Sequence, residues 1–346
     1  MNNLVITLAV WGERYRNRFL NWTVKSLLSN NNIPRSFGVL ECTLLIITTS
    51  IDREEIDRNR SIKELKKFIK IQYEEIKPEE NAFSKYSLLS NCHDFAINFA
   101  RIRNSWLMIT NPDSFYSDGS ILELVTRIQL NQTCVMSTAI SVDELRFEKW
   151  LYENEFKLEK PSLSISSRDL IKAIINSFHT QEQKSFFDST DFTVHPSQIH
   201  WRIDDTAFLS RIAHRCPILI KPSGSRFELR STYDDSYLEQ SGIPLDKIEY
   251  ITDSDKFLCA HIVGDDYQET YSLGKPVSII EFAKWLKRSS DVYHRHHLNK
   301  EYIFHCSNLT SKVVKRIKFK SHIFILISKI ISLLPHKALK MLSKVL

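Results

Sequence analysis

Short apolar runs alternate with longer, helically patterned segments along the first 140 residues. The apolar runs predict strands at residues 4–10, 43–49, 69–76, 106–110 and 133–140. Between them, apolar side chains recur at helical spacing and predict helices at residues 18–28, 51–68, 84–102 and 120–130. This alternation is typical of a mostly parallel sheet with helices on both faces, so we predict an α/β fold.

The pattern is less regular from residue 141 onwards. We expect helices near residues 167–178, 206–214 and 279–287, a strand at 217–221, and one or two strands within 248–310. Residues 186–201 look irregular. Because no repeat or linker divides the chain, we take residues 1–140 and 141–310 as two halves of one domain, followed by a tail, residues 311–346.

The tail carries lysines and arginines among bulky aliphatic residues at helical spacing, and Glu301 is the last acidic residue of the chain. Its apolar core, residues 323–334, is too short to span a bilayer but suits an anionic membrane surface. Pro335 is expected to separate two helices. A terminal helix packed on the domain and a partner-binding helix are the alternatives. We expect no nucleic-acid binding, because aliphatic residues rather than stacking aromatics separate the basic ones.

Composition excludes several classes of protein. The six cysteines stand singly, which indicates a reducing compartment and neither a disulfide framework nor a zinc site. The seven glycines also stand alone, so the glycine-rich loops of NAD enzymes, P-loop ATPases and typical α/β-hydrolases do not occur. The N-terminal apolar run lacks the basic flank of a signal peptide. We therefore expect a cytoplasmic protein.

The predicted ligand site lies where the strands of the first half end, since α/β sheets bind ligands at the carboxyl edge of their strands. Residues 10–14, Thr48 and Thr49, and Asp113 all follow predicted strands. A carboxylate such as Asp113 can hold a divalent cation that neutralises a diphosphate. The alternative is that Asp113 begins a turn and that Asp118 caps the next helix.

The segment Val10-Trp11-Gly12-Glu13-Arg14, the strand–helix alternation without a glycine-rich loop, and the acidic residue at position 113 together resemble the GT-A class of glycosyltransferases. As a whole the chain is similar to bacterial transferases that build cell-surface polysaccharide or lipopolysaccharide. The resemblance implies that residues 1–140 bind a nucleotide-sugar, with Mg²⁺ or Mn²⁺ held by Asp113. The sequence departs from that class because it has one carboxylate at this position where two are usual. We therefore expect the cationic side chain of Arg14 to help offset the negative charge of the diphosphate. The candidate donor-binding residues are Val10, Trp11, Gly12, Glu13, Arg14, Thr48, Thr49, Asn91, His93, Asp113 and Asp118.

The second half is expected to hold the acceptor and the catalytic base. A transfer that inverts configuration needs a carboxylate to take the proton of the acceptor hydroxyl. Asp234 and Asp235 lie between tyrosines with no strong helix pattern behind them, which makes them the candidate base. His195, His200 and Trp201 form a polar and aromatic stretch of the kind that binds sugars, although ordinary loops have similar compositions.

Two functions follow from the sequence. The first is a glycosyltransferase that moves a sugar from a nucleotide-sugar to a glycan or lipid-linked acceptor, peripheral on the inner face of the cell membrane. The alternative is a non-catalytic, membrane-associated scaffold that keeps the fold, which the single carboxylate at Asp113 favours.

Overall fold

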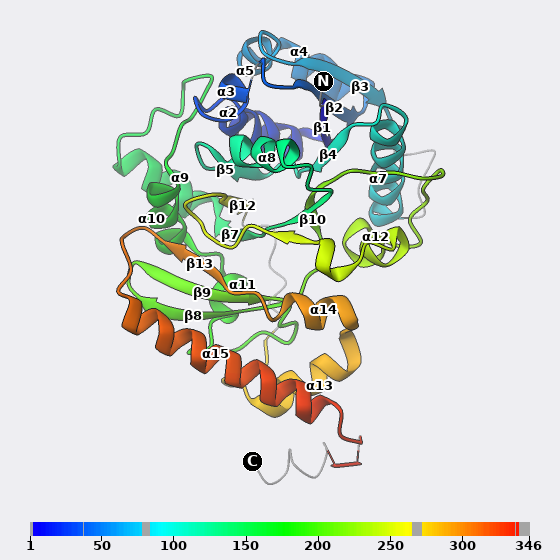
Figure 1. Cartoon of the computed structure of the whole chain (residues 1–346). Coiled ribbons are helices and arrows are strands. Elements are labelled where there is room, and N and C mark those ends of the chain that lie inside the picture. Colours follow the sequence, from blue (N-terminus) through cyan, green and yellow to red (C-terminus); the bar gives the residue numbers. More distant parts are fainter. Residues whose placement is uncertain (1–2, 37, 78–83, 265–271, 336, 339–346) are drawn as a thin grey trace.

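A seven-stranded sheet forms the centre of the computed structural model, which describes residues 3–36, 38–77, 84–264, 272–335 and 337–338 (Figure 1). The strands, in their order across the sheet, are β11 (Glu249–Tyr250), β6 (Cys134–Met136), β10 (Pro217–Ile220), β4 (Trp106–Ile109), β1 (Asn3–Ala9), β2 (Glu41–Thr48) and β3 (Lys70–Glu75). All neighbouring pairs are parallel except those of β10, which runs antiparallel to β4 and β6. The predicted mostly parallel α/β sheet is therefore confirmed.

Helices cover both faces of this sheet because its central strands are apolar on both sides. Alternate residues of β1 enter two different cores: Leu4, Ile6 and Leu8 face one, and Val5 and Ala9 face the other. On the first face lie the π-helical η1 (Phe19–Thr23), α2 (Val24–Leu27), α3 (Ile33–Ser36), α4 (Ser50–Arg58), α5 (Arg60–Leu65) and α8 (Ser120–Gln129). On the second lie α7 (Lys85–Ile102) and α12 (Tyr233–Ser241).

Two small sheets form the lower part of the molecule. One has the order β5 (Ser114–Tyr116), β12 (Cys259–Val263) and β7 (Ala139–Asp143), and the other has the order β13 (Tyr302–His305), β9 (Ala207–Ile212) and β8 (Gln198–Asp204). Their common core includes α9 (Glu144–Glu153) and α10 (Ser167–Ser177). The remaining elements are α1 (Glu13–Arg18), α11 (Thr180–Lys184), η2 (Leu245–Lys247), α13 (Ile279–Ser289), α14 (Val292–His297) and α15 (Ser311–Ser332).

Two sequence predictions for the middle of the chain are wrong. Residues 133–140 do not form one strand, because the chain leaves the large sheet after β6 and enters a small sheet as β7. Residues 206–214 do not form a helix: they contain β9, which pairs with β8 on one side and β13 on the other. Every residue of β9 is buried, so its sequence lacks the alternation that would have indicated a strand.

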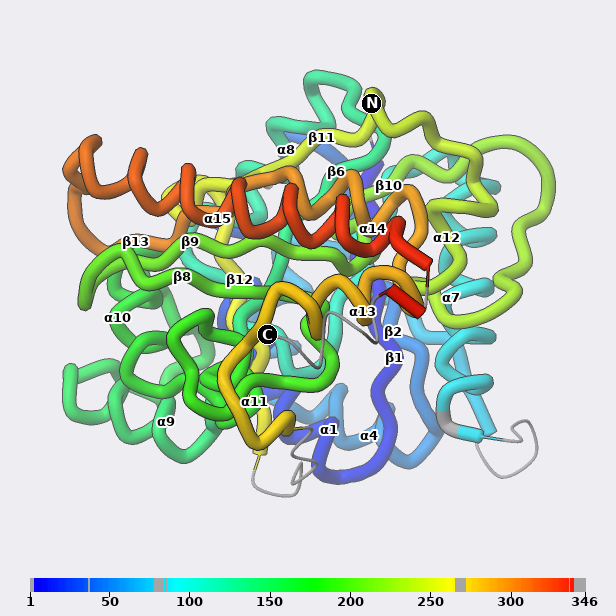
Figure 2. Tube along the Cα trace, turned by 90° about the horizontal axis from the view of Figure 1, so that it is seen from below, coloured from blue at the N-terminus to red at the C-terminus, as the bar shows by residue number. Residues whose placement is uncertain are grey.

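The C-terminal helix α15 packs along the second small sheet and beside α13 (Figure 2). Its inward face consists of Ser321, Phe324, Ile325, Ser328 and Ser332. Of the tail predicted at residues 311–346, residues 336 and 339–346 lie outside the described residues, and with them the second helix expected after Pro335. Among the helices that the structure describes, none has the length and apolar character to cross a bilayer.

Arg211 fixes this helix to the sheet. Its guanidinium is almost fully buried on β9, donates to Ser321 Oγ on α15 at 3.1 Å, and pairs with Glu301 at 2.6 Å. It also donates to the main-chain carbonyl of Asn299 at 2.9 Å. A buried cation needs such partners, since an unpaired charge in the interior is strongly destabilising.

We therefore expect Arg211→Ala to lower the free energy of unfolding by about 3 kcal/mol, as for other broken buried ion pairs. The control is Arg58→Ala, which removes exposed ion pairs on α4 and is expected to cost less than about 1 kcal/mol. Urea denaturation of both variants measures the difference. Equal costs would show that Arg211 does not anchor α15.

Candidate functional site

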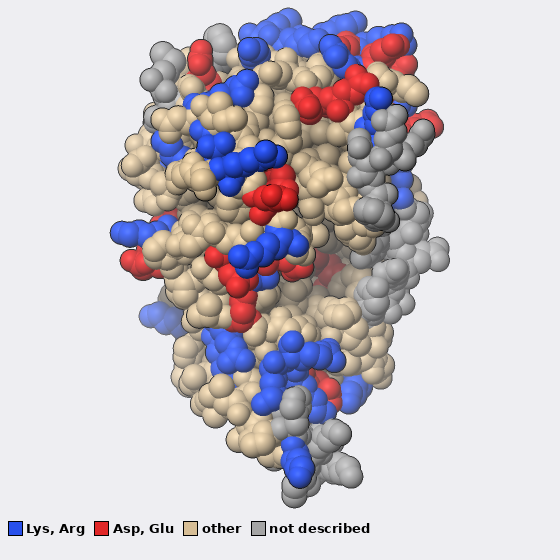
Figure 3. All heavy atoms as spheres, turned by 90° about the vertical axis from the view of Figure 1, so that its right-hand side faces the viewer, with Lys and Arg blue, Asp and Glu red and all other residues tan. Residues whose placement is uncertain are grey.

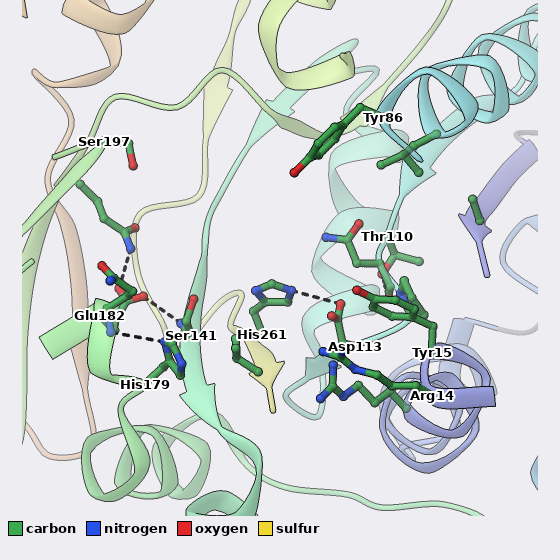
Figure 4. A pocket seen from close by; sticks show the side chains of 18 of the residues that line it. Arg14, Tyr15, Tyr86, Thr110, Asp113, Ser141, His179, Glu182, Ser197 and His261 are labelled. Atoms are coloured by element: carbon green, nitrogen blue, oxygen red, sulfur yellow. Dashed lines mark hydrogen bonds and ion pairs between the residues drawn. The ribbon is translucent and has the colours of Figure 1, made fainter. Parts of the chain in front are cut away.

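A cavity of about 600 Å³ opens at the carboxyl ends of β1 and β4, between the large sheet and the two small ones (Figure 4). One wall comes from the β1–α1 turn, α7 and the β4–β5 turn. The opposite wall comes from β7, α11 and residues 193–198, and His261 of β12 lies between the two walls. The position agrees with the rule that α/β sheets bind ligands at the carboxyl edge of their strands.

Asp52, a nearly buried residue of α4, shapes the first wall. Its Oδ2 accepts the Gly12 N–H at 2.9 Å and the Thr49 hydroxyl at 2.9 Å, and its Oδ1 pairs with Arg16 at 2.7 Å. Gly12 has a φ of +80°, in the left-handed region that favours glycine. The turn fixed in this way presents Trp11, whose neighbours Arg14 and Tyr15 also line the cavity.

Arg18 follows at the end of α1 and brings a nearly buried cation to the same wall. Its Nε and Nη2 atoms donate to Oε2 of Glu144 at 3.0 and 2.8 Å. The other carboxylate oxygen, Oε1, accepts the indole N–H of Trp22 at 2.9 Å. This two-bond contact holds the guanidinium plane in one orientation.

Asp113 and His261 form an ion pair at the centre of the cavity. His261 Nε2 lies 3.1 Å from Asp113 Oδ1, and both side chains line the cavity (Figure 4). Burial raises the pKa of the Asp113 carboxyl, but the charge and hydrogen-bonding contact of His261, a backbone hydrogen bond and the charge of Arg18 together bring the net pKa below the ordinary value. The charge of Asp113 raises the pKa of His261 against the effect of burial. Each group therefore favours the charged form of the other.

Strand pairing places this ion pair next to the second wall. In the sheet β5-β12-β7, His261 is the register partner of Ser114 on one side and of Ser141 on the other. Ser141 in turn bonds to α11: its N–H donates to Glu182 Oε2 at 3.1 Å, and its carbonyl accepts the His179 N–H at 3.0 Å. A row of residues thus runs from Asp113 through His261 and Ser141 to Glu182.

The second wall is polar. Glu182 is 2% exposed, and its Oε1 accepts from Gln198 Nε2 at 2.6 Å and lies 2.7 Å from His200 Nε2. Burial lowers the pKa of His179, so this imidazole is neutral near pH 7. The other polar side chains that line this wall are Ser141, Gln181, Ser185, Thr193, His195 and Ser197.

The structure brings five of the sequence-predicted site residues to the cavity: Trp11, Arg14, His93, Asp113 and His195. Of these, His93 is mostly buried beside Tyr233, and burial lowers its pKa to about 4. Other donor-site candidates support the site from behind or beside it without lining it, namely Val10, Gly12, Glu13, Thr48 and Thr49. Thr49 is the N-cap of α4, which accounts for its place at the strand end.

Three candidates have other surroundings. Asn91 is exposed on α7 and does not line the cavity. Asp118 accepts from the main-chain N–H and the side chain of Asn31 at 2.8 and 2.6 Å, so it holds the loop before α3. Trp201 faces away from the cavity, because it alternates with His200 along β8 and packs on Phe324 of α15.

Asp234 and Asp235 also lie elsewhere. The sequence predicted no strong helix behind them, which is wrong: both are exposed in the first turn of α12 and neither lines the cavity. Negative charge at a helix N-terminus is stabilising, and this accounts for their position. Asp234 affects the site through its charge, which raises the pKa of His93 against the larger effect of burial.

The sequence analysis missed His261, Glu182 and Arg18 as site residues. His261 and Glu182 have ordinary strand and helix surroundings in sequence, and they meet the first wall only through strand pairing. Arg18 stands in the helix after the first strand, close to Arg14, and this proximity was the one available signal.

The ion pair predicts a pH-dependent stability. The raised pKa of His261 stabilises the fold fully below its unfolded value of about 6.5, and this is lost as pH rises through the folded pKa. The lowered pKa of Asp113 stabilises the fold above about pH 3.9, and this is lost as pH falls through its folded pKa. The pair therefore contributes most between about pH 4 and 6.5.

We expect the unfolding free energy lost in His261→Gln to be largest in this window and to shrink towards pH 9. Urea titrations at several pH values measure it. His322→Gln, which changes an exposed histidine of α15, serves as the control and is expected to show no such trend. A loss for His261→Gln that stays constant across the range would contradict the ion pair.

Comparisons with known proteins do not assign a family. No family model matches the chain, and no curated protein matches it. Among the solved structures to which it is similar is mouse xyloside xylosyltransferase 1 in its apo form, at 14% identity and a TM-score of 0.25 over 44% of this chain. The chain spans 59% of the length of that structure. So low a TM-score carries no argument, and any functional conclusion must come from the cavity itself.

Proposed function

We propose that the chain is a glycosyltransferase that binds a nucleotide-sugar in the cavity at the carboxyl edge of the sheet. The observation that carries the proposal is the contrast between its two walls. The wall of Arg14 and Arg18 is cationic and aromatic, whereas the wall of α11 is polar and mostly uncharged. A sugar nucleotide needs the first kind of surface for its phosphates and base, and a sugar acceptor needs the second.

The diphosphate lies, in this proposal, between the two guanidinium groups and His261. Asp113 pairs with His261, and Arg14 and Arg18 add two further positive charges to the lining. Trp11, Tyr15 and Tyr86 line the same part of the cavity and supply flat surfaces for a nucleobase. The leaving diphosphate gains negative charge during transfer, and fixed cations stabilise it there.

The donor set also fits a divalent cation. Asp113 offers a carboxylate and His261 an imidazole nitrogen on one side of the cavity. Mg²⁺ or Mn²⁺ takes one or two protein ligands when substrate phosphates and water complete its shell. The cation would take the place of the imidazolium proton and neutralise the diphosphate. A second cluster, Asp253, Asp255 and His305, lies outside the cavity lining, and Arg168 already pairs with it.

We also propose that the enzyme acts at the inner membrane face on a glycan or lipid-linked acceptor, with α15 as the contact. The inward face of α15 carries three serines beside Phe324 and Ile325, whereas other bulky apolar residues of the helix are exposed. The exposed ones follow one stripe: Phe319, Ile323, Leu326, Ile327, Ile330 and Leu333. Exposed basic residues accompany them at Lys312, Lys315, Arg316 and Lys320. An exposed apolar stripe with cations beside it is suited to anionic lipid headgroups.

The surface supports this location. Figure 3 shows Lys and Arg side chains gathered among uncharged ones at the lower end of the molecule, where α13 and α15 lie in Figure 1. A partner protein is the alternative occupant of the same stripe. The absence of acidic residues after Glu301 favours an anionic lipid surface instead.

Nucleotide binding tests the donor site. We expect UDP, GDP or dTDP to raise the melting temperature, and CMP, which lacks the second phosphate, to do so less. A ligand at about 100 times its Kd stabilises a protein by roughly 2.7 kcal/mol. Asp113→Asn is expected to lose the part of the shift that depends on Mn²⁺, because it removes the carboxylate ligand.

The control for this experiment is Asp169→Asn, which changes an exposed aspartate of α10 and should keep the full shift. The outcome that contradicts the proposal is the lack of a shift with every nucleotide, with and without Mn²⁺. That outcome would favour the non-catalytic scaffold.

Vesicle pelleting tests the membrane contact. We expect the double variant Ile330→Glu/Leu333→Glu to bind vesicles of phosphatidylcholine and phosphatidylserine more than about tenfold less, since burying each side chain is worth roughly 1.5–3 kcal/mol. Both side chains are more than half exposed, so the fold should be unaffected. The matched control, Ile102→Glu/Leu130→Glu, changes equally exposed residues on α7 and after α8. Equal binding by both variants would exclude α15 as the contact.

A further inference from the structure

We propose that Glu182 is the catalytic base, which accepts the proton of the attacking hydroxyl of a sugar acceptor bound against α11. The inference rests on the proposed function and replaces Asp234 and Asp235 in that role. It follows from the place of Glu182 in the row of residues across the cavity, from its hydrogen bonds, and from the wall around it.

The row places Glu182 on the far side of His261 from Asp113 (Figure 4). Ser141 and His261 are register partners on β7 and β12, and neighbouring strands lie about 4.8 Å apart. Because Ser141 bonds directly to Glu182, this carboxylate is about one strand spacing further from Asp113 than His261 is. A donor whose diphosphate lies at Asp113 and His261 thus has its sugar directed towards Glu182.

The hydrogen bonds of Glu182 leave it able to accept one more. Among the described residues, Gln198 and His200 reach Oε1, and the Ser141 N–H reaches Oε2. A carboxylate can accept about four hydrogen bonds. Glu182 also lines the cavity, so the remaining position at Oε2 is the one a substrate hydroxyl can occupy.

His200 holds the carboxylate in place from behind. It is fully buried on β8, and its Nδ1 lies 2.6 Å from Ser210 Oγ on β9. Phe186 and Phe208 pack against its ring at centroid distances of 5.0 and 5.5 Å. The imidazole cannot turn within this packing, so it positions Glu182 and does not itself reach the cavity.

The surrounding wall suits a hydroxyl-rich acceptor. Hydroxyl and amide groups line it at Ser141, Gln181, Ser185, Thr193, Ser197 and Gln198. Such groups both donate and accept, which is what a sugar with several hydroxyls requires. A charged acceptor group would instead need an opposite charge on this wall.

In the proposed step, the acceptor oxygen forms a bond to the anomeric carbon while the bond from that carbon to the diphosphate oxygen breaks. The bonding pair leaves with the nucleoside diphosphate, and the hydroxyl proton passes to Glu182 Oε2. The products are the glycoside, the nucleoside diphosphate and a protonated Glu182 that later releases its proton to water. Attack from the side opposite the leaving group inverts the anomeric configuration.

Among the residues that the structure describes, titratable groups face Glu182 from three of the elements around it. They are His179 on its own helix, His200 on β8 and His261 on β12. The pH dependence of the reaction must therefore be compared between variants, and not assigned from wild type alone.

Hydrolysis of UDP-glucose, GDP-mannose or dTDP-glucose, with water as the acceptor, tests the inference. The donor is chosen by the nucleotide that stabilises wild type in the thermal-shift experiment. We expect Glu182→Gln to bind that nucleotide as wild type does and to lose at least about 100-fold in kcat, the usual contribution of a general base. In wild type we expect kcat to fall at acid pH, and in Glu182→Gln we expect this fall to be absent. The sugar released by wild type should have the anomeric configuration opposite to that of the donor.

The matched control is Glu123→Gln, which removes a partly buried ion pair with Arg127 on α8, away from the cavity lining. This variant shows what the loss of a partly buried carboxylate does to the enzyme in general. We expect it to keep the kcat of wild type and the pH dependence of kcat. His200→Gln tests the positioning role and should lower kcat while keeping the acid limb.

The outcomes separate the two proposals. No nucleotide shift in wild type would remove the proposed function itself. If wild type binds a nucleotide, three results would overturn the role of Glu182 alone. They are undiminished hydrolysis by Glu182→Gln, no hydrolysis by wild type, and release by wild type of a sugar with the anomeric configuration of the donor.

Discussion

The candidate site depends on the pairing of one short strand, β12, with β5 and β7. β5 lies directly after Asp113, whereas β7 is bonded to α11. Within the described residues β12 is the strand that joins the two, and the Ile262 N–H donates to the Asp113 carbonyl at 2.8 Å. Residues separated by more than 100 positions are thereby fixed within a few strand spacings of each other. Without this pairing no strand would connect the two walls of the cavity.

Burial then decides which charges a ligand can meet. Charged groups that lose water need partners, so Arg18 pairs with Glu144, and Glu182 receives donors from three residues. Asp113 and His261 lie 3.1 Å apart as an ion pair of opposite charges. On the first wall, Arg18 is held in a fixed orientation by Glu144, which lies outside the cavity lining. Such fixed charges need not reorganise when a leaving group becomes negative, which is the condition for electrostatic catalysis.

The first half of the fold could be predicted from the sequence because its signals are local. The runs that form β1, β2 and β4 are apolar throughout, as buried parallel strands are, and the helices between them have clear spacing. The rule that ligands bind at the carboxyl edge of the sheet then predicted Trp11, Arg14 and Asp113 as site residues, and all three line the cavity. The predictions for the second half failed where the pairing of distant segments, and not the local sequence pattern, decides the structure. β9 is buried on both faces, and nothing near Glu182 or His261 in sequence indicates the partner across the cavity.

The tail shows why periodicity alone could not identify the surface of α15. The spacing predicted a helix, and a helix forms, but an amphipathic pattern does not say which face meets the domain. Serines at positions 321, 328 and 332 face inwards, where small side chains allow α15 to lie close to α13, and Ser321 bonds with Arg211. Other bulky side chains, such as Ile330 and Leu333, remain exposed and increase the apolar area of the surface at a cost in solvation. A helix that buries Phe324 and Ile325 and still exposes a stripe of bulky apolar residues is organised for a second contact. The basic residues beside that surface make an anionic contact the one that it fits.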